Sequence, residues 1–284
     1  MWRWWRDWRG LQSSQVESTK YPTGVGIQEM KIPKYQNPKN GDFAITVRHF
    51  MNLVHFKNWI VDFLFPMECV ECGEEGSFIC DDCLQKIPLN AMQVCLVCRK
   101  DSIHGITHEQ CKSKTTLDGL LVASRYNDNP LLDKLIERFK FQYSTSLASP
   151  LGFLLLRTLG NSSFSAQGMV VVPVPLHRSR RRWRGFNQAE LLAKEIAMWC
   201  DLPIIDGLER TKKTRQQSKL SRGDRLKNVK DAFIVEPIHE LALRNRIILL
   251  IDDVASTTAT LEESAKALKK AGATKMIGLV LARG

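Results

Sequence analysis

The sequence has no run of about 18 or more apolar residues, the length that a helix needs to cross a membrane. It has neither the Gly-Lys-Ser/Thr ending of a Walker A loop nor the glycine-rich fingerprint of dinucleotide-binding folds. The first absence argues against a transmembrane helix, and the second means that the loop after residues 247–251 is neither a P-loop nor a dinucleotide-binding loop. What is present is a globular composition, 44% hydrophobic and 25% charged over 284 residues, which suffices for one large core and a smaller module.

Acidic residues are few relative to basic ones: 41 Lys and Arg stand against 30 Asp and Glu, a net charge of +11. This balance favours a polyanionic partner or a phosphorylated ligand. The positive charge is concentrated in residues 178–184 and 210–230. We predict that the first segment is a loop and that the second becomes ordered only around a ligand.

Residues 1–50 show no sustained hydrophobic period and begin with tryptophans that alternate with arginines. We interpret them as a disordered basic extension, or as sequence upstream of a true start near Met51. The alternative is a short helix on an anionic membrane surface, since the apolar core of a secretory signal is missing. Residues 51–66 have the apolar spacing of an amphipathic helix that ends at Pro66.

Paired metal ligands dominate residues 67–112. Each pair is separated by two residues, a spacing that lets both side chains bind one ion from a tight turn. The eight candidate ligands are Cys69, Cys72, Cys80, Cys83, Cys95, Cys98, His108 and Cys111. They suffice for two structural zinc sites, with consecutive or interleaved pairing; His104 is a poorer substitute for His108. Disulfides are the competing explanation, which the lack of a secretory signal disfavours.

From residue 116 to 284 strand patterns alternate with helix patterns. Strands are predicted at 117–126, 169–177, 202–205, 232–235, 247–251 and 276–281, and helices at 131–141, 149–159, 188–199 and 262–272. Asn187 and Glu190 form a candidate capping box. The alternation predicts an α/β fold, a parallel sheet flanked by helices, whose ligands bind beyond the carboxyl ends of the strands.

The aliphatic run 247–251 is followed by two acids, a loop of small hydroxylated residues and a helix, an arrangement suited to a phosphate beside hydroxyls. It resembles the motif of type I phosphoribosyltransferases that binds phosphoribosyl pyrophosphate. The resemblance implies that Asp252 and Asp253 hold the ribose hydroxyls. It assigns the 5′-phosphate to Ser256, Thr257, Thr258, Ala259 and Thr260. Thr258 stands where that family usually has glycine, so the loop is expected to be reshaped.

Further motifs occur in the order that is seen in the ComF family. They are Val172-Pro173-Val174-Pro175, Arg184-Gly185-Phe186-Asn187-Gln188, Thr214-x2-Gln217-x2-Leu220 and Arg225-x2-Asn228-Val229-x2-Ala232-Phe233. The chain is similar to that family over residues 52–284. The resemblance implies a type I phosphoribosyltransferase-like domain after a double zinc ribbon. It also implies a cytoplasmic role in DNA uptake and natural transformation, with a competence helicase or uptake protein as partner.

Two functions remain open at this point. In the first, the chain binds phosphoribosyl pyrophosphate with Mg2+ and transfers the phosphoribosyl group to an unknown acceptor. In the second, it is a non-catalytic module for single-stranded DNA, with phosphoribosyl pyrophosphate as ligand or signal. Trp183 or Phe186 then stacks on bases, unless both only pack on the sheet. Candidates for the pyrophosphate or the nucleic acid are Arg178, Arg180, Arg181, Arg184, Lys140, Arg215, Gln217 and Arg225.

Overall fold

The computed structural model describes residues 67–90, 92–141, 144–212, 229–255 and 257–284. All of them belong to one compact unit, Asn58–Gly284. The predictions for residues 1–50 and 51–66 therefore lie outside the described residues. So do those for four site candidates, Ser256, Arg215, Gln217 and Arg225.

The N-terminal part of this unit is a small module built on turns. Its short helices are α3 (Asp81–Gln85), η1 (Ile103–Gly105) and η2 (Glu109–Lys114). Gly73, directly after Cys72, has a φ of +78°, which a residue without a Cβ adopts easily. A module with so little regular structure needs a further source of stability, such as a bound metal.

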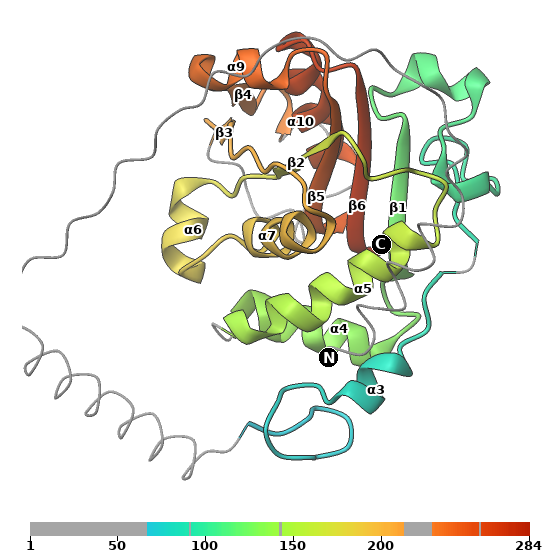
Figure 1. Ribbon diagram of the computed structural model, residues 1–284, viewed down its shortest axis with the longest axis vertical. Coiled ribbons are helices and arrows are strands. Elements are labelled where there is room, and N and C mark those ends of the chain that lie inside the picture. The colour runs from blue at the N-terminus through green and yellow to red at the C-terminus, as the bar shows by residue number, and fades with distance from the viewer. Residues whose placement is uncertain (1–66, 91, 142–143, 213–228, 256) are drawn as a thin grey trace, which may run out of the picture. The chain divides into compact units, whose positions relative to one another are not determined.

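A parallel sheet forms the centre of the second part. Its strands are β1 (Gly119–Arg125), β2 (Met169–Pro173), β5 (Ile247–Ala255) and β6 (Lys275–Arg283). Their order is β1-β6-β5-β2, and each neighbouring pair is parallel (Figure 1). The predicted α/β class is confirmed, and the aliphatic run lies in an interior strand of this sheet, as expected.

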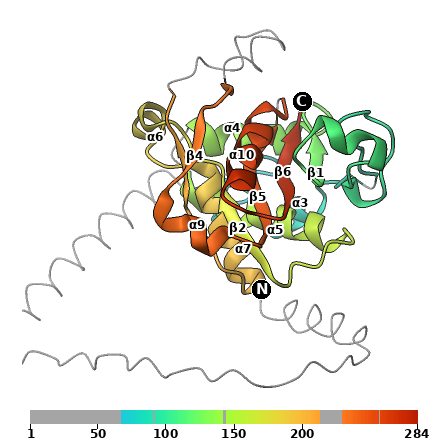
Figure 2. The same cartoon turned by 90° about the horizontal axis from the view of Figure 1, so that it is seen from above.

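Helices cover both faces of the sheet. They are α4 (Pro130–Phe141), α5 (Ala148–Gly160), α7 (Gln188–Cys200) and α10 (Ala259–Lys270). Leu249 and Ile251 belong to the core cluster of α4, α5 and α7, whereas Ile248 and Leu250 belong to that of α10. Figure 2 shows α10 on one side of the strands and α5 and α7 on the other. Because successive residues of a strand point to opposite faces, burial on both sides explains the unbroken aliphatic run.

Smaller elements lie outside the main sheet. They are η3 (Thr145–Leu147), α6 (Arg178–Arg184), β3 (Leu208–Arg210), β4 (Phe233–Val235) and α9 (Pro237–Leu243). β3 and β4 pair with each other in antiparallel orientation. Within the described ranges, no helix has the length and apolar character required to span a bilayer.

The arginine segment corrects one prediction, because residues 178–184 are helical. The His177 ring accepts a hydrogen bond from the backbone N–H of Ser179 at the start of α6, and Gly185 ends the helix with a φ of +79°. Arginine is a good helix former, and the concentration of charge had suggested a loop.

Further boundaries differ from the predictions, among them the end of the strand expected at 169–177, which stops at Pro173, the first of two prolines. The strand expected at 202–205 is a single bridge between Val171 and Ile204. β5 continues through both acids to Ala255, and α10 begins three residues earlier than predicted, at Ala259. Pairing with the neighbouring strands therefore extends β5 beyond its aliphatic run. The segment 202–205, in contrast, pairs at Ile204 alone.

The N-cap of α7 is as predicted, but the reciprocal half of its capping box is not formed. The Asn187 side chain accepts a hydrogen bond from the N–H of Ala189 and donates one to the carbonyl of Val174. Glu190 instead forms ion pairs with Arg181 and Lys194. Asn187 thus joins the exit of β2 to the start of α7.

Candidate functional site

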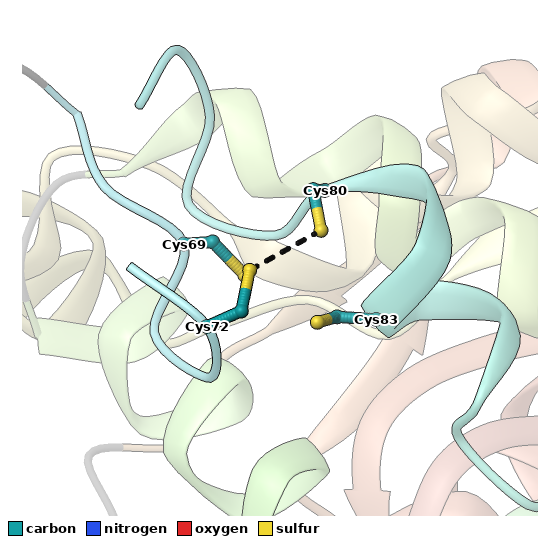
Figure 3. A group of neighbouring side chains, drawn as sticks. All are labelled: Cys69, Cys72, Cys80 and Cys83. Carbon is teal, nitrogen blue, oxygen red and sulfur yellow. Dashed lines mark hydrogen bonds between the residues drawn. The ribbon is translucent and has the colours of Figure 1, made fainter. Parts of the chain in front are cut away.

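The eight predicted metal ligands form two tetrads. The first comprises Cys69, Cys72, Cys80 and Cys83, and the second comprises Cys95, Cys98, His108 and Cys111. Within each tetrad the ligand atoms all lie within 4.8 Å of one another, and in Figure 3 the four thiols of the first converge. The pairing is therefore consecutive rather than interleaved, and His108, not His104, completes the second tetrad.

Distances inside the tetrads fit a shared metal ion. The sulfur atoms of Cys72 and Cys80 are 3.6 Å apart, and Cys98 Sγ lies 3.3 Å from His108 Nδ1. Two thiolates on one tetrahedral zinc are expected about 3.7 Å apart, given Zn–S bonds of about 2.3 Å. All eight cysteines of the chain are free rather than joined in disulfides. The donor sets and their spacing support structural zinc at both tetrads.

One thiol in each tetrad is held in an acidified setting. Burial raises the pKa of Cys69, but hydrogen bonds from the backbone around Cys72 and Cys80 outweigh it and bring the pKa to about 6. In the second tetrad burial also raises the pKa of Cys95, and backbone groups of Cys98 and His108 lower it to about 6. A thiolate is the form that binds a metal, so at Cys69 and Cys95 the backbone turns favour the ligating state.

The two acids lie at the carboxyl end of β5. Asp253 is 8% exposed, and its Oδ2 lies 3.4 Å from Lys140 Nζ at the end of α4. The backbone N–H of Asp253 donates to Asp252 Oδ1, and the N–H of Val254 donates to Asp253 Oδ1. The structure thus brings three sequence-predicted residues, Lys140, Asp252 and Asp253, to one place.

Burial sets the electrostatics of this pair. It raises the pKa of Asp252 to about 7, with a further increase from the charge of Asp253, while Lys140 and Arg210 oppose both effects. Arg210, at the end of β3, is only 5% exposed. Burial and the neighbouring Arg180 lower the pKa of Arg210 to about 10, whereas Asp252 raises it. Two carboxylates and several cations therefore share a poorly solvated edge.

Arg210 is a candidate site residue that we did not select from the sequence. From the sequence it belongs to the basic residues of 210–230, which we predict to become ordered only around a ligand. The signal that could have identified it is the alternation Leu208-Glu209-Arg210, which on a short strand places Arg210 on the buried face with Leu208.

The loop after β5 leads directly into α10. Thr258, the N-cap residue, has a φ of −70° and makes no side-chain cap hydrogen bond. A β-branched residue adopts this φ without strain, so the threonine at the usual glycine position imposes no unfavourable backbone geometry. Thr257 Oγ1 is buried and has no hydrogen-bond partner among the described residues. The first-turn amides of a helix lack intrahelical acceptors, so this end of α10 can hold an anion.

The predicted arginines on α6 divide into two groups. Arg178 pairs with Glu209 at 2.8 Å and Arg181 pairs with Glu190 at 2.9 Å, both near the surface. Arg180 is half-buried, and burial together with the nearby Arg184 lowers its pKa. The charge of Arg180 also lowers the pKa of Arg210, whereas Arg178 and Arg181 are held by other partners.

The two aromatic candidates have different environments. Phe186 is half-buried and packs on Phe139, with ring centroids 5.6 Å apart. Trp183 is 63% exposed and meets Phe141 edge-on at 5.9 Å. The guanidinium of Arg184 lies over the same Phe141 ring at 5.4 Å. Packing thus accounts for Phe186, while Trp183, Phe141 and Arg184 form a partly exposed cluster, here called the aromatic-arginine cluster.

Comparisons with known proteins agree with this two-part architecture. A family model described as a double zinc ribbon domain matches residues 60–113. Competence protein F of Haemophilus influenzae is 30% identical over 220 residues, 73% of this chain and 93% of that protein. Competence protein ComFC of Bacillus subtilis is 29% identical, with 68% of this chain and 79% of that protein covered.

Two other matches are shorter. DNA utilization protein YhgH of Escherichia coli is 34% identical over 148 residues, 51% of this chain and 63% of that protein. Among solved structures, one titled as the allosteric regulatory enzyme of purine biosynthesis aligns with a TM-score of 0.32 at 19% identity. That alignment covers 49% of this chain and 25% of the enzyme.

The fold and the tetrads define an α/β protein that carries an N-terminal double zinc ribbon. The extent of its identity to competence protein F specifies the group further: the chain belongs to the ComF family. The family resemblance of the sequence motifs is thereby confirmed.

Zinc content tests the two tetrads. We expect two zinc ions per chain by atomic emission, because each tetrad provides a complete set of ligands. Cys98→Ser should reduce the content to about one ion and lower the thermal unfolding temperature. Cys200→Ser is the matched control, since this cysteine lies outside both tetrads and should leave two ions bound. One ion or none in the unsubstituted protein would contradict the assignment.

The poorly solvated Asp252 predicts an unusual dependence of stability on pH. Because the folded-state pKa of Asp252 is raised to about 7, the folded protein binds more protons than the unfolded chain below that pH. The free energy of unfolding should therefore fall as pH rises from about 4 to 7 on account of this group. Asp252→Asn should make urea unfolding harder at pH 8, with a smaller difference at pH 5.

Asp253→Asn serves as the comparison for that measurement. It removes the partner of Lys140 and leaves a poorly solvated cation, so this variant should be less stable than the parent at pH 8. If Asp252→Asn is destabilised at pH 8 as much as Asp253→Asn, then ionised Asp252 does not reduce the stability of the folded protein.

Proposed function

We propose that this chain binds phosphoribosyl pyrophosphate, with Mg2+, at the carboxyl end of β5, as a phosphoribosyltransferase-like protein of DNA uptake in the cytoplasm. One observation carries the proposal: Asp252 and Asp253 lie in the C-terminal part of β5, the strand that precedes the anion-binding end of α10. A phosphosugar needs both features together, since its phosphate and its diol lie a few bonds apart. The names of the relatives, competence proteins and DNA utilization proteins, support the wider role.

The residues divide the ligand between them. Asp252 and Asp253 accept hydrogen bonds from the ribose hydroxyls, and Ser256 to Thr260 hold the 5′-phosphate through backbone amides and hydroxyls. Arg180 and Arg210 face the pyrophosphate. Lys140 orients the Asp253 side chain through its 3.4 Å contact. Carboxylate oxygens are also the donors that Mg2+ prefers, and the ion would neutralise the pyrophosphate leaving group.

Transfer of the phosphoribosyl group would develop positive charge at the anomeric carbon. Two carboxylates in a poorly solvated edge stabilise such charge better than water does, because no solvent has to reorganise. Asp252 must be ionised to do so, and its raised pKa of about 7 means that ligand affinity increases as pH rises through neutrality. The acceptor is not specified by these residues, and Asp253 is the candidate general base.

A second function, a module for single-stranded DNA, is favoured by the aromatic-arginine cluster. Trp183 and Phe141 expose ring surface beside Arg184, an arrangement that accepts an unstacked base. The exposed arginines of α6 provide phosphate contacts along the same helix. Under this function phosphoribosyl pyrophosphate acts as a ligand or signal and no group is transferred.

Calorimetric titration tests the phosphosugar site. Phosphoribosyl pyrophosphate with Mg2+ should bind saturably to the zinc-loaded protein. The double variant Asp252→Asn/Asp253→Asn should bind at least about 100-fold more weakly, because it loses two charge-assisted sets of hydrogen bonds. Asp201→Asn removes a carboxylate elsewhere, at a left-handed position that asparagine tolerates, and should bind normally. Equal affinity in all three proteins would exclude the acids as the ribose site.

Binding of an oligothymidylate tests the DNA-binding function separately. Trp183→Ala should weaken binding about tenfold at low salt, since one stacked base contributes about 1–3 kcal/mol. Trp183→Phe should largely restore it, and Ile238→Ala, which removes an 81% exposed apolar side chain on α9, should have no effect. Binding that is insensitive to both salt and Trp183 would argue against this surface.

A further inference from the structure

We propose that Glu262, in the first turn of α10, is a positioning residue that connects the second zinc tetrad to the loop between β5 and α10, here called the phosphate loop. Through this connection, called the tie below, zinc binding and phosphosugar binding reinforce each other. The phosphosugar half of this proposal rests on the proposed function. The zinc half rests on contacts within the described residues. Neither the paired acids nor the metal ligands include Glu262, so its role lies in joining two sites.

Glu262 holds the chain segment that leaves the second tetrad. The hydroxyl of Thr115 donates to Glu262 Oε2 at 2.6 Å, and the hydroxyl of Thr116 donates to Oε1 at 2.8 Å. The backbone N–H of Thr116 also donates to Oε1 at 2.8 Å and to Oε2 at 3.1 Å. These threonines follow closely after Cys111, a ligand of the tetrad. All three residues are partly buried, which makes charge-assisted hydrogen bonds stronger than at an open surface.

The other ligand pair of the same tetrad has its own connection to the sheet. Arg283, 7% exposed at the end of β6, donates through Nη2 to the carbonyl of Leu96, which directly follows the ligand Cys95. Arg283 stands opposite Ala255 in the register, at the entrance to the phosphate loop. Leu96 also shares a core cluster with Leu261, the residue before Glu262. Both halves of the second tetrad are thus fixed to the structure that carries the loop.

The first tetrad is attached to a different part of the domain. Cys69 and Cys83 belong to the core cluster of α4, α5 and α7. Phe78 lies beneath the guanidinium of Arg138 on α4, 4.9 Å from its ring centroid. Since these contacts are with the opposite layer from α10, the first tetrad provides an internal control within the same molecule.

The physical effect of the tie is preorganisation. A loop whose following helix turn is already fixed loses less conformational freedom when a phosphate binds, and therefore binds it more tightly. By linkage, the bound phosphate must stabilise the zinc-bound form of the second tetrad by the same factor. The tie thus predicts an effect in each direction.

The neighbouring residue provides a matched control. Glu263 lies in the same turn of α10 with the same charge, but its Oε2 accepts from the backbone N–H of Asp231, outside the zinc module. Glu263→Gln and Glu262→Gln therefore alter the helix dipole equally. Only Glu262→Gln weakens the connection to Thr115 and Thr116.

The experiment measures alkylation of each cysteine by N-ethylmaleimide in the full zinc-loaded chain, with peptide mass spectrometry, with and without saturating ribose 5-phosphate. In the parent protein the ligand should slow alkylation of Cys95, Cys98 and Cys111 but not that of the first tetrad. Glu262→Gln should speed alkylation of the second tetrad about tenfold and abolish its protection by the ligand. Glu263→Gln should behave as the parent.

A second variant keeps the test decisive if Glu262→Gln folds poorly. Thr115→Val removes one donor from the zinc side and should reproduce the effect, and the double variant should add little, because both changes break one connection. Two results together would overturn the tie and leave the proposed function intact. In the first, ribose 5-phosphate binds the parent protein but does not selectively slow alkylation of the second tetrad. In the second, Glu262→Gln and Glu263→Gln are alkylated at equal rates. Failure of the parent to bind ribose 5-phosphate would instead overturn the proposed phosphosugar site, and this inference with it.

Discussion

The poor solvation of two adjacent carboxylates near the end of β5, Asp253 buried and Asp252 half-buried, is the constraint on which the remaining site depends. An acid in a poorly solvated place is costly when ionised, and the raised pKa of Asp252 measures that cost. Lys140 from α4 and Arg210 from β3 offset it from two different layers of the domain. The helices on one face and the small antiparallel pair on the other must therefore both be in place before the acids can be charged together.

The parts of this arrangement that are local in sequence could be predicted. The strand period of 247–251, the start of α7 at Asn187 and the two-residue spacing of the metal ligands each reflect contacts made within a few residues. The type of fold follows from them, because an aliphatic run without alternation has to be covered on both faces. For the same reason Asp252 and Asp253 could be placed at a strand end from the sequence.

The parts that depend on distant partners could not be predicted. Consecutive pairing of the tetrads is a property of the folded turns, and both arrangements have the same spacing. Arg210 becomes a candidate site residue through the pairing of β3 with β4, which sets it opposite Phe233. Glu262 becomes a junction because Thr115 and Thr116 reach it from far along the chain. The helix at 178–184 was likewise not predicted, because its dense positive charge suggested a loop and the cap contact of the His177 side chain is visible only in the folded structure.

The two functions considered for this chain share one structural unit, the end of α4. Lys140 contacts Asp253. The ring of the next residue, Phe141, makes an edge contact with the ring of Trp183 and lies beneath the guanidinium of Arg184. A change in the last turn of α4 must therefore alter both the surroundings of Asp252 and Asp253 and the aromatic-arginine cluster. Binding of a base and binding of a phosphosugar are coupled through this turn if both occur, and neither excludes the other. The acceptor of a transferred group and a stacked nucleotide would then occupy neighbouring positions on one surface.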